Sequence, residues 1–414
     1  MSTVASPPSA PHASSIDART LREAIARELP DLINIRRDLH AHPEIGYEEH
    51  RTSQVVQREL KNAGVEFKPD LAGGTGVFGH IPSSTGSKAI GLRADMDALP
   101  ILETSGVPYA STITGKMHAC GHDGHTTMLI GAARVLAKLA KQSPLPRPVS
   151  FVFQPAEEGG AGGKRMVEDG CLTGKLLGPP IESMFGLHCW PRLPLGVVGT
   201  RVGPLLAASD RFDIKVRGIG SHAAFPHASR DPIVAACAIV NALQTIASRN
   251  VDPLDSIVVS ITMLHAGTAF NVIPPEAVIS GTVRTLLPHT QQLAQKRLLE
   301  ISEGIARGYA CSAELDYRIG YPVTLNHAGM VNLFNDVATH TLGAERVVDL
   351  PQPVMGGEDF AFYSQQVPSC FFVLGLIPQG QKSMPDLHQP DFNFNDDAIA
   401  TGVEMFCRLA MRPN

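Results

Sequence analysis

The sequence predicts an α/β protein in which a discontinuous catalytic-type domain, with a mostly parallel sheet between helices, carries an inserted ferredoxin-like domain. Outside residues 204–320, short and continuously apolar segments alternate with helical segments. This pattern is typical of parallel strands that are buried on both faces. Residues 204–320 instead show alternating strands and two helices in the order β-α-β-β-α-β, the split βαβ arrangement. We therefore expect residues 16–203 and 321–414 to form one domain and residues 204–320 to form the other.

The composition is that of an ordinary globular protein and argues against several classes of partner. The chain has 414 residues, 43% of them hydrophobic, a net charge of −5 and no basic block, so neither nucleic acid nor an anionic membrane is expected as a partner. No apolar run is long enough to cross a bilayer. The seven cysteines are odd in number and scattered, which argues against a disulfide framework and favours reduced thiols in the cytoplasm.

The N-terminal segment predicts a disordered tail followed by a long helix. Residues 1–15 are rich in Ala, Pro and Ser and lack the basic start and apolar centre of a secretory signal. From Asp17 onward, apolar residues recur at helical spacing, and Pro30 is expected to break or kink the helix. His40 and His42 close this segment. A structural role at a helix end is favoured for them over metal ligation.

Polar side chains follow the apolar strands that the sheet is expected to contain. Such strands are predicted at residues 88–92, 148–153, 183–187 and 369–376. The polar residues that come after them, in chain order, are Arg93, Asp95 and Asp97, then Glu157 and Glu158, then His188 and finally His388. Because ligands gather at the carboxyl ends of parallel strands, these side chains are expected at one edge of the sheet. Their residue types favour a metal site there.

A cluster of metal-binding side chains lies in residues 117–136. The turn that begins this segment holds one thiol and three imidazoles, Cys120, His118, His122 and His125. Gly121 lacks the side chain that would keep the backbone from bringing two of these donors together. A Cys-x-His pair suits zinc, nickel or cobalt better than magnesium. The alternative is a set of ordinary buried residues, which fits a lone Cys or His better than a cluster.

The adjacent carboxylates Glu157 and Glu158 offer two roles. One can bind metal, while the other faces the substrate and acts as a general base on water whose pKa the metal lowers. The candidate ligands are then five in number, Cys120, His122, Glu158, His188 and His388. Five ligands are too many for one catalytic zinc that keeps an open position. Two metal ions about 3.5 to 4 Å apart, bridged by thiolate or water, fit better.

Ten motifs between about residues 30 and 400 carry a resemblance to a known family. In chain order they are RRDLHAHPEIGYEE, RADMDALP, MHACGHDGHT, QPAEEGG, GLH, GSHAAFPH, NVIPPEA, GTVRT, GGEDFAFY and LHQPDFNFNDDAI. They resemble the dinuclear-metal peptidases and amidohydrolases, which include aminoacylases. Within that family the chain is most similar to the hippurate hydrolase and N-acyl-amino-acid amidohydrolase subgroup, which also contains plant auxin-conjugate hydrolases.

The resemblance implies roles for the residues of the sheet edge. It implies metal ligation by the five residues Cys120, His122, Glu158, His188 and His388, with Glu157 as general base. Most of the family has His-x-Asp where this chain has Arg93-Ala94-Asp95, and Asp where this chain has Cys120. The resemblance therefore implies two divalent metal ions, and their identity stays open among zinc, manganese, nickel and cobalt. Asp95 and Asp97 are then expected to orient a ligand histidine, or to serve a structural role at the strand end.

The resemblance also implies that the inserted domain is a lid and dimerisation domain. His222, in GSHAAFPH, would reach the active site of the partner subunit and stabilise an oxyanion, and Asn271 would help to bind substrate. Arg284, in GTVRT, could meet the substrate's carboxylate as a bidentate pair or form a surface salt bridge. A homodimer through this domain is expected, alone or within a larger homo-oligomer.

The expected function is hydrolysis of a small N-acyl amino acid, hippurate-like, aryl-acyl or acetyl, to a carboxylic acid and a free amino acid. A dipeptidase or carboxypeptidase is the nearest alternative, and it would bind a free amino group on the acyl side. A non-catalytic metal-binding scaffold is disfavoured because Glu157 is present. A two-metal phosphoesterase would be expected to offer a cationic clamp, yet Arg93 is the only basic residue among the strand-end motifs.

Overall fold

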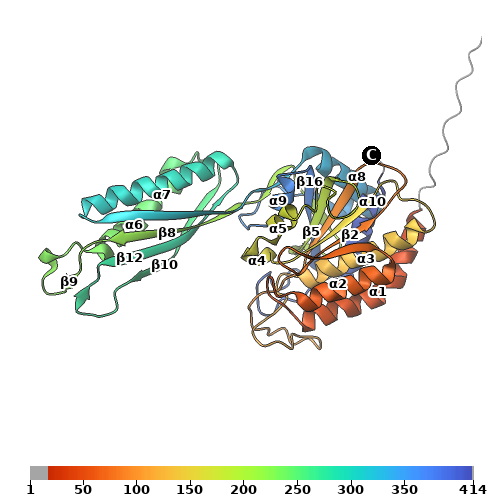
Figure 1. Ribbon diagram of the computed structural model, residues 1–414, viewed down its shortest axis with the longest axis horizontal. Coiled ribbons are helices and arrows are strands. Elements are labelled where there is room, and N and C mark those ends of the chain that lie inside the picture. Colours follow the sequence, from red (N-terminus) through yellow and green to blue (C-terminus); the bar gives the residue numbers. More distant parts are fainter. Residues whose placement is uncertain (1–16, 413–414) are drawn as a thin grey trace, which may run out of the picture.

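The structure is a computed structural model that describes residues 17–412, so the tail expected at residues 1–15 lies outside the described residues. Figure 1 shows an elongated molecule made of two parts. We call the part that holds the large sheet the α/β body, and the part that runs from β8 (Ala208–Arg217) to β13 (Ser312–Tyr321) the outer unit. None of the described helices is both long and apolar enough to cross a membrane.

The α/β body is built on an eight-stranded sheet of order β1-β2-β4-β3-β5-β16-β6-β15. The four central strands β4, β3, β5 and β16 are parallel to one another, which confirms the α/β class with a mostly parallel sheet. The strands are β1 Glu66–Leu71, β2 Gly76–Ile81, β3 Ala89–Asp95, β4 Val149–Gln154, β5 Ile181–Pro194, β6 Val198–Thr200, β15 Val347–Asp349 and β16 Ser369–Ile377. The sequence did not indicate β1 and β2, which form an antiparallel hairpin at one edge.

Helices cover both faces of this sheet. Alternate strand residues such as Phe151 and Phe153 point to one face, where they share a core with five helices, whereas Val152 points to the other face. The five helices are α1 Ala18–Ala41, α2 His50–Ala63, α3 His122–Ala140, α8 Ala328–Leu342 and α10 Ile399–Met411. The opposite face packs against α5 (Gly162–Glu168) and α9 (Ala361–Ser364). Helices packed on both faces of the sheet therefore fix the position of its strands and of their carboxyl ends.

The break expected at Pro30 is wrong, because α1 runs without interruption from Ala18 to Ala41. Pro30 lies on the exposed side of the helix, while Leu21, Leu32 and Leu39 are fully buried. Packing of this apolar side against α3 and α10 holds the helix together. The carbonyl that loses its partner at a proline can bond to water on the exposed side.

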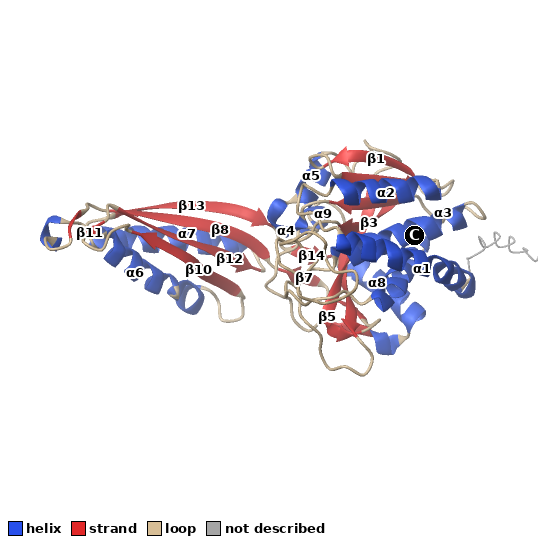
Figure 2. Cartoon of the chain, turned by 90° about the horizontal axis from the view of Figure 1, so that it is seen from below, coloured by secondary structure: helices blue, strands red, loops and turns tan. Residues whose placement is uncertain are grey.

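The outer unit is a four-stranded antiparallel sheet with two helices on one face (Figure 2). The strand order is β10-β12-β8-β13, with β10 at Ile257–Ala266 and β12 at Glu276–Thr285. The helices are α6 (Pro232–Leu243) and α7 (Pro288–Gly308). The small pair β9 (Ser221–His222) and β11 (Val272–Ile273) lies at the tip farthest from the α/β body (Figure 1).

The chain passes between the two parts at two places. On the way out, β7 (Gly203–Leu206) still pairs with β14 (Thr324–Asn326) of the α/β body, and β8 begins at Ala208. On the way back, β13 ends at Tyr321, which is still in register with Ser209 of β8. Both connections are therefore short and lie side by side at the base of the four-stranded sheet.

Candidate metal centre and active site

The five residues expected to bind metal come from separate segments that meet beyond the carboxyl ends of β3 and β4. Side chains from these segments form groups whose potential ligand atoms lie within 4.8 Å of one another. One group is Cys120, His122 and His188, and a second is Cys120, Glu158 and His388. The thiol of Cys120 therefore belongs to both groups. Two neighbouring ion sites that share a sulfur ligand are consistent with this arrangement.

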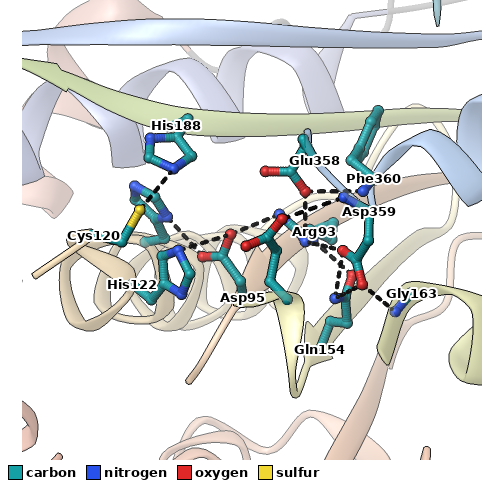
Figure 3. A network of polar contacts seen from close by, with 12 residues as sticks. Arg93, Asp95, Cys120, His122, Gln154, Gly163, His188, Glu358, Asp359 and Phe360 are labelled. Carbon is teal, nitrogen blue, oxygen red and sulfur yellow. Dashed lines mark hydrogen bonds and ion pairs between the residues drawn. The ribbon is translucent and has the colours of Figure 1, made fainter. Parts of the chain in front are cut away.

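Cys120 and His122 reach this position through a turn that only glycine can make. Gly121 has φ +81°, and a Cβ atom there would lie 2.5 Å from the sulfur of Cys189. Both the backbone conformation and the space therefore require glycine. Beyond the turn, His122 begins α3. The Cys120 sulfur lies 3.4 Å from Nε2 of His188 (Figure 3).

The candidate ligands His122 and His188 are oriented by hydrogen bonds on the ring nitrogens that point away from the cluster. Nδ1 of His122 donates to Asp97 (3.2 Å), and Nδ1 of His188 donates to the carbonyl of Cys189 (2.7 Å). Both rings therefore present Nε2 to the cluster. Nε2 of His122 is buried and has no hydrogen-bond partner within residues 17–412. A buried unpaired nitrogen is costly, and a metal ion at this point would satisfy it, so the donor set fits a metal.

The second group is formed by the loop that carries His388 and the turn that carries Glu158. His388 has a positive φ of 65° and its backbone N–H donates to the carbonyl of Ala119, which fixes the loop beside Cys120. Nε2 of His388 lies 3.1 Å from the Glu158 carboxylate. Burial would raise the pKa of Glu158, but His388 and His122 lower it. Glu158 is therefore anionic, as a metal ligand must be.

His125 lies in the same cluster but has no nitrogen left for a metal. Its Nδ1 donates to Asp95 at 2.6 Å, and its Nε2 accepts the backbone N–H of Cys189 at 2.9 Å. His125 therefore fixes the backbone next to His188. Asp95 bonds to His125 and Arg93, and its nearest atom lies 3.7 Å from Nε2 of His122. Asp97 is the carboxylate that bonds to the candidate ligand His122.

A buried arginine organises three carboxylates behind the metal ligands (Figure 3). Arg93 is fully buried and contacts Asp95, Glu358 and Asp359 at 2.7 to 2.9 Å. Gln154 also accepts from the Arg93 guanidinium, at 2.9 Å. No role was predicted for Glu358 and Asp359, although both stand in the motif GGEDFAFY. Nothing in a single sequence shows that residues 266 positions apart form an ion pair.

Glu157 has the properties of a proton-transfer group. It stands in the short turn α4 (Glu157–Gly160), between Ala156 and Ala161, which both have left-handed backbone conformations with φ near +55°. Its carboxylate is buried and accepts the backbone N–H of Asp359 at 3.3 Å. Burial, together with the charges of Glu358 and Glu158, raises the pKa of Glu157 well above its usual value. The pKa values of Glu157 and Glu158 are thus pushed apart, as in acid–base pairs with separate roles.

Two cavities border the cluster. The first, of about 530 Å³, includes His188 and His388 and is otherwise largely apolar, with side chains that include Trp190, Leu205, Leu350, Val354, Phe371 and Leu387. The second, of about 750 Å³, includes Glu157 and Glu158 together with the cations Lys164, Arg211, Arg284 and Arg318. The cluster therefore lies between a largely apolar cavity and a cationic cavity. The sequence could not indicate the apolar cavity, because its lining comes from segments far apart in the chain.

The three residues expected on the inserted domain lie in two different places. His222 is exposed and belongs to β9, which lies at the tip of the outer unit (Figure 1); it is close to Asn271, whose carbonyl accepts the N–H of Ala223. Neither residue is brought to the metal ligands of its own chain. Arg284, on β12, instead lines the cationic cavity beside Glu157 and Glu158. It forms no ion pair with a carboxylate of the described chain.

Known proteins share both this sequence pattern and this fold. The model of peptidase family M20/M25/M40 matches residues 91–412. The chain belongs to this family. Its sequence is 40% identical over 382 residues to an N-acetylcysteine deacetylase of Bacillus subtilis, covering 92% of this chain and 96% of the relative. It is 41% identical over 385 residues to an IAA-amino acid hydrolase of Arabidopsis thaliana, covering 92% and 86%.

A solved structure supports the same placement. It is a dinuclear metal binding peptidase of the M20 family from Bacillus subtilis, with a TM-score of 0.79 and 36% identity over 94% of this chain and 98% of that one. The resemblance to the amidohydrolase subgroup with auxin-conjugate hydrolases is confirmed. This M20 protein is an enzyme, a metal-dependent amidohydrolase.

Proposed function

We propose that this enzyme hydrolyses N-acyl amino acids whose acyl group is apolar and larger than acetyl. The observation that carries the proposal is the pair of unlike cavities beside one cluster of metal ligands. An N-acyl amino acid has an apolar end and an anionic end with an amide between them. The apolar cavity beside His188 and His388 suits the acyl group, and the cationic cavity beside Glu157 suits the amino acid's carboxylate.

This orientation agrees with the position of the proton-transfer group. Glu157 takes a proton from the attacking water and returns it to the departing amine. It lies in the wall of the cationic cavity, which is where the amine half of the substrate would sit. Arg284, in the same wall, would pair with the carboxylate of the amino acid.

We infer that two divalent ions, of zinc, manganese, nickel or cobalt, are held by Cys120, His122, Glu158, His188 and His388. Bound there, they would polarise the amide carbonyl and lower the pKa of the attacking water. The support is the presence of Cys120 in both ligand groups. The soft thiolate makes magnesium a poor candidate. Asp97 holds the His122 ring in position for ligation.

We further infer that residues 204–320 are an inserted lid that joins two subunits, and that residues 16–203 and 321–414 form the catalytic domain. Strand β9, which holds His222, lies at the tip farthest from the α/β body (Figure 1), so His222 would act in the partner's site, where it donates to the oxyanion and Asn271 contacts the substrate. Strand β10 is an edge of its sheet and exposes Met263 and Leu264, which supports a homodimer, alone or within a larger homo-oligomer.

Two further features bear on the alternatives. Among the described residues, Asp386 is the only carboxylate in the wall of the apolar cavity, and Arg192 pairs with it at 2.6 Å. A free amino group on the acyl side would find no unpaired anion among these lining residues, which disfavours a dipeptidase.

All seven cysteines are free thiols, which supports a cytoplasmic location.

A series of N-acyl substrates tests the proposal. After reconstitution with each metal, kcat/KM is measured for glycine carrying acetyl, hexanoyl, benzoyl or indole-acetyl groups, with glycyl-glycine as the dipeptide. We expect the larger apolar acyl groups to exceed acetyl by about tenfold or more, because one or two buried methylenes contribute about 1 kcal/mol each.

A variant that fills the apolar cavity locates this preference. Val354→Trp should lower kcat/KM for the benzoyl substrate about tenfold or more, because the ring would occupy the same space. The acetyl substrate serves as the internal control and should be cleaved as by the wild type. Equal losses on both substrates, or a wild-type preference for acetyl, would remove the apolar cavity from the proposal.

A further inference from the structure

The hydroxyl of Tyr321 joins the outer unit to the turn that carries Glu157. It donates to the carbonyl of Glu157 at 2.5 Å and accepts the backbone N–H of Ala161 at 3.1 Å. One atom therefore holds both ends of the turn that presents Glu157. The sequence indicated Glu157 but not Tyr321, which lies 164 positions away.

Tyr321 belongs to the outer unit by its backbone and to the α/β body by its side chain. It is the last residue of β13 and remains in register with Ser209 of β8. Its ring packs edge-on against Phe362, with ring centres 6.0 Å apart. Burial raises the pKa of Tyr321 above its usual value, so the phenol keeps the proton that it donates to Glu157. The side chain thus moves with the base of the four-stranded sheet.

The turn depends on such contacts because its backbone conformation is unfavourable. Ala156 and Ala161 both have left-handed conformations, with φ +52° and +56°, which cost free energy for any residue with a Cβ atom. Side chains of the α/β body supply three contacts to the backbone of the turn: Glu49 accepts from the N–H of Ala156, Asp97 accepts from the N–H of Glu158, and Tyr47 donates to the carbonyl of Gly160. Tyr321 supplies its contact from the outer unit.

We propose that Tyr321 is a positioning residue which links the orientation of the outer unit to the placement of the Glu157 carboxylate. The proposal rests on the proposed role of Glu157 in proton transfer. A rotation of the outer unit about its two connections would move the Tyr321 hydroxyl, and with it the carbonyl of Glu157. Closure of the lid would then bring the base to its working position only when substrate is enclosed.

The second connection supports the same link. Where the chain leaves the α/β body, the N–H of Ala207 donates to the carbonyl of Gly356 at 2.8 Å. Gly356 is followed two residues later by Glu358 and Asp359, and the N–H of Asp359 donates to the Glu157 carboxylate. The outer unit is therefore linked to Glu157 in two ways. Tyr321 bonds to the backbone carbonyl of Glu157, and the segment that contacts Ala207 supplies the Asp359 N–H that bonds to the Glu157 carboxylate.

The variant Tyr321→Phe tests the proposal, because it removes only the hydroxyl and keeps the ring on Phe362. We expect kcat to fall about 10- to 100-fold, because a general base displaced by a fraction of an ångström loses much of its effect. KM should stay within about twofold, because Tyr321 lines the cationic cavity but its hydroxyl is already bonded to Glu157 and Ala161. Metal content and melting temperature, measured on the same samples, should match those of the wild type.

Tyr317→Phe is the matched control. Tyr317 lies on the same strand, and its hydroxyl donates to Asp210 within the outer unit at 2.6 Å. This variant loses one part-buried hydrogen bond, where Tyr321→Phe loses two, and it should keep the wild-type kcat. If the two variants lose kcat equally, or if Tyr321→Phe loses metal, Tyr321 serves the fold alone and the proposal fails.

The outcomes separate this inference from the function on which it rests. Glu157→Gln is measured in parallel. If Glu157→Gln is fully active, the role of Glu157 is wrong whatever Tyr321 does. If Glu157→Gln is inactive while Tyr321→Phe has the wild-type kcat, only the positioning role of Tyr321 is wrong.

Discussion

The cluster of candidate metal ligands and the tip of the outer unit differ in how far one chain completes them. In the cluster, His122 and His188 are buried and each has its far nitrogen fixed by a hydrogen bond. At the tip, His222 is exposed and its Nδ1 accepts only a local N–H, that of Ala224. Phe270, next to Asn271, is fully exposed. The cluster is thus preorganised within one chain, and the tip is not.

The proposed homodimer would therefore affect the cluster and the tip differently. A preorganised site keeps its geometry in the free subunit, so metal binding should survive in isolated subunits. An exposed histidine can act in catalysis only when another surface surrounds it and excludes water. The comparison therefore predicts that changes in the cluster and changes at the tip will have separable effects on metal content and on turnover.

The largest effect should come from the adjacent carboxylates of the cluster. Glu157→Gln should keep both metals and lower kcat by about three to four orders of magnitude, because the amide cannot take up the water's proton. Glu158→Gln should instead lose metal affinity, because it removes the anion that pairs with His388. Metal analysis by mass spectrometry and steady-state kinetics on the same samples distinguish the two. Swapped phenotypes would exchange the roles of these residues.

The next largest effect should come from the tip. His222→Ala should lower kcat about 10²- to 10³-fold, as expected for loss of an oxyanion donor, without changing metal content or melting temperature. His227→Ala is the matched control, because His227 is also exposed in the same loop and should leave kcat unchanged. Equal losses in both variants would point to a general effect on the loop.

Mixed dimers then decide whether His222 acts across the subunit boundary. A dimer of one His222→Ala subunit and one Glu157→Gln subunit has one site with both defects and one site with neither. Each such dimer should recover up to about half of the wild-type activity. The mixed dimers are purified with two different affinity tags, and their catalytic activity is measured. If they recover no activity, His222 does not complete the partner's site.

The sequence predicted the parts of this protein that local patterns encode. The apolar runs of β3, β4, β5 and β16 identified the parallel sheet, and the rule for strand ends placed the candidate ligands at one edge. Contacts between distant segments escaped prediction. Arg93 with Glu358 and Asp359, and Tyr321 with Glu157, depend on the way the chain returns to the α/β body after the outer unit. Pro30 was misjudged because tertiary packing outweighs a local helix breaker.

The smallest effect should come from Arg284, which lies between the two regions, at the base of the outer unit in the wall of the cationic cavity. Burial and the nearby charge of Arg211 lower the pKa of Arg284, and an anionic substrate group would relieve that repulsion. Arg284→Met should raise KM for an N-acyl amino acid about tenfold with kcat within about threefold, because the carboxylate is bound equally in the ground and transition states. The same acyl amino acid with its carboxylate converted to an amide should bind the variant and the wild type equally.

Arg217→Met is the control, since Arg217 lies on the same sheet but pairs with Glu276 and Glu314. If KM for the amide rises as much as KM for the acid, Arg284 supports the cavity wall and does not read the carboxylate.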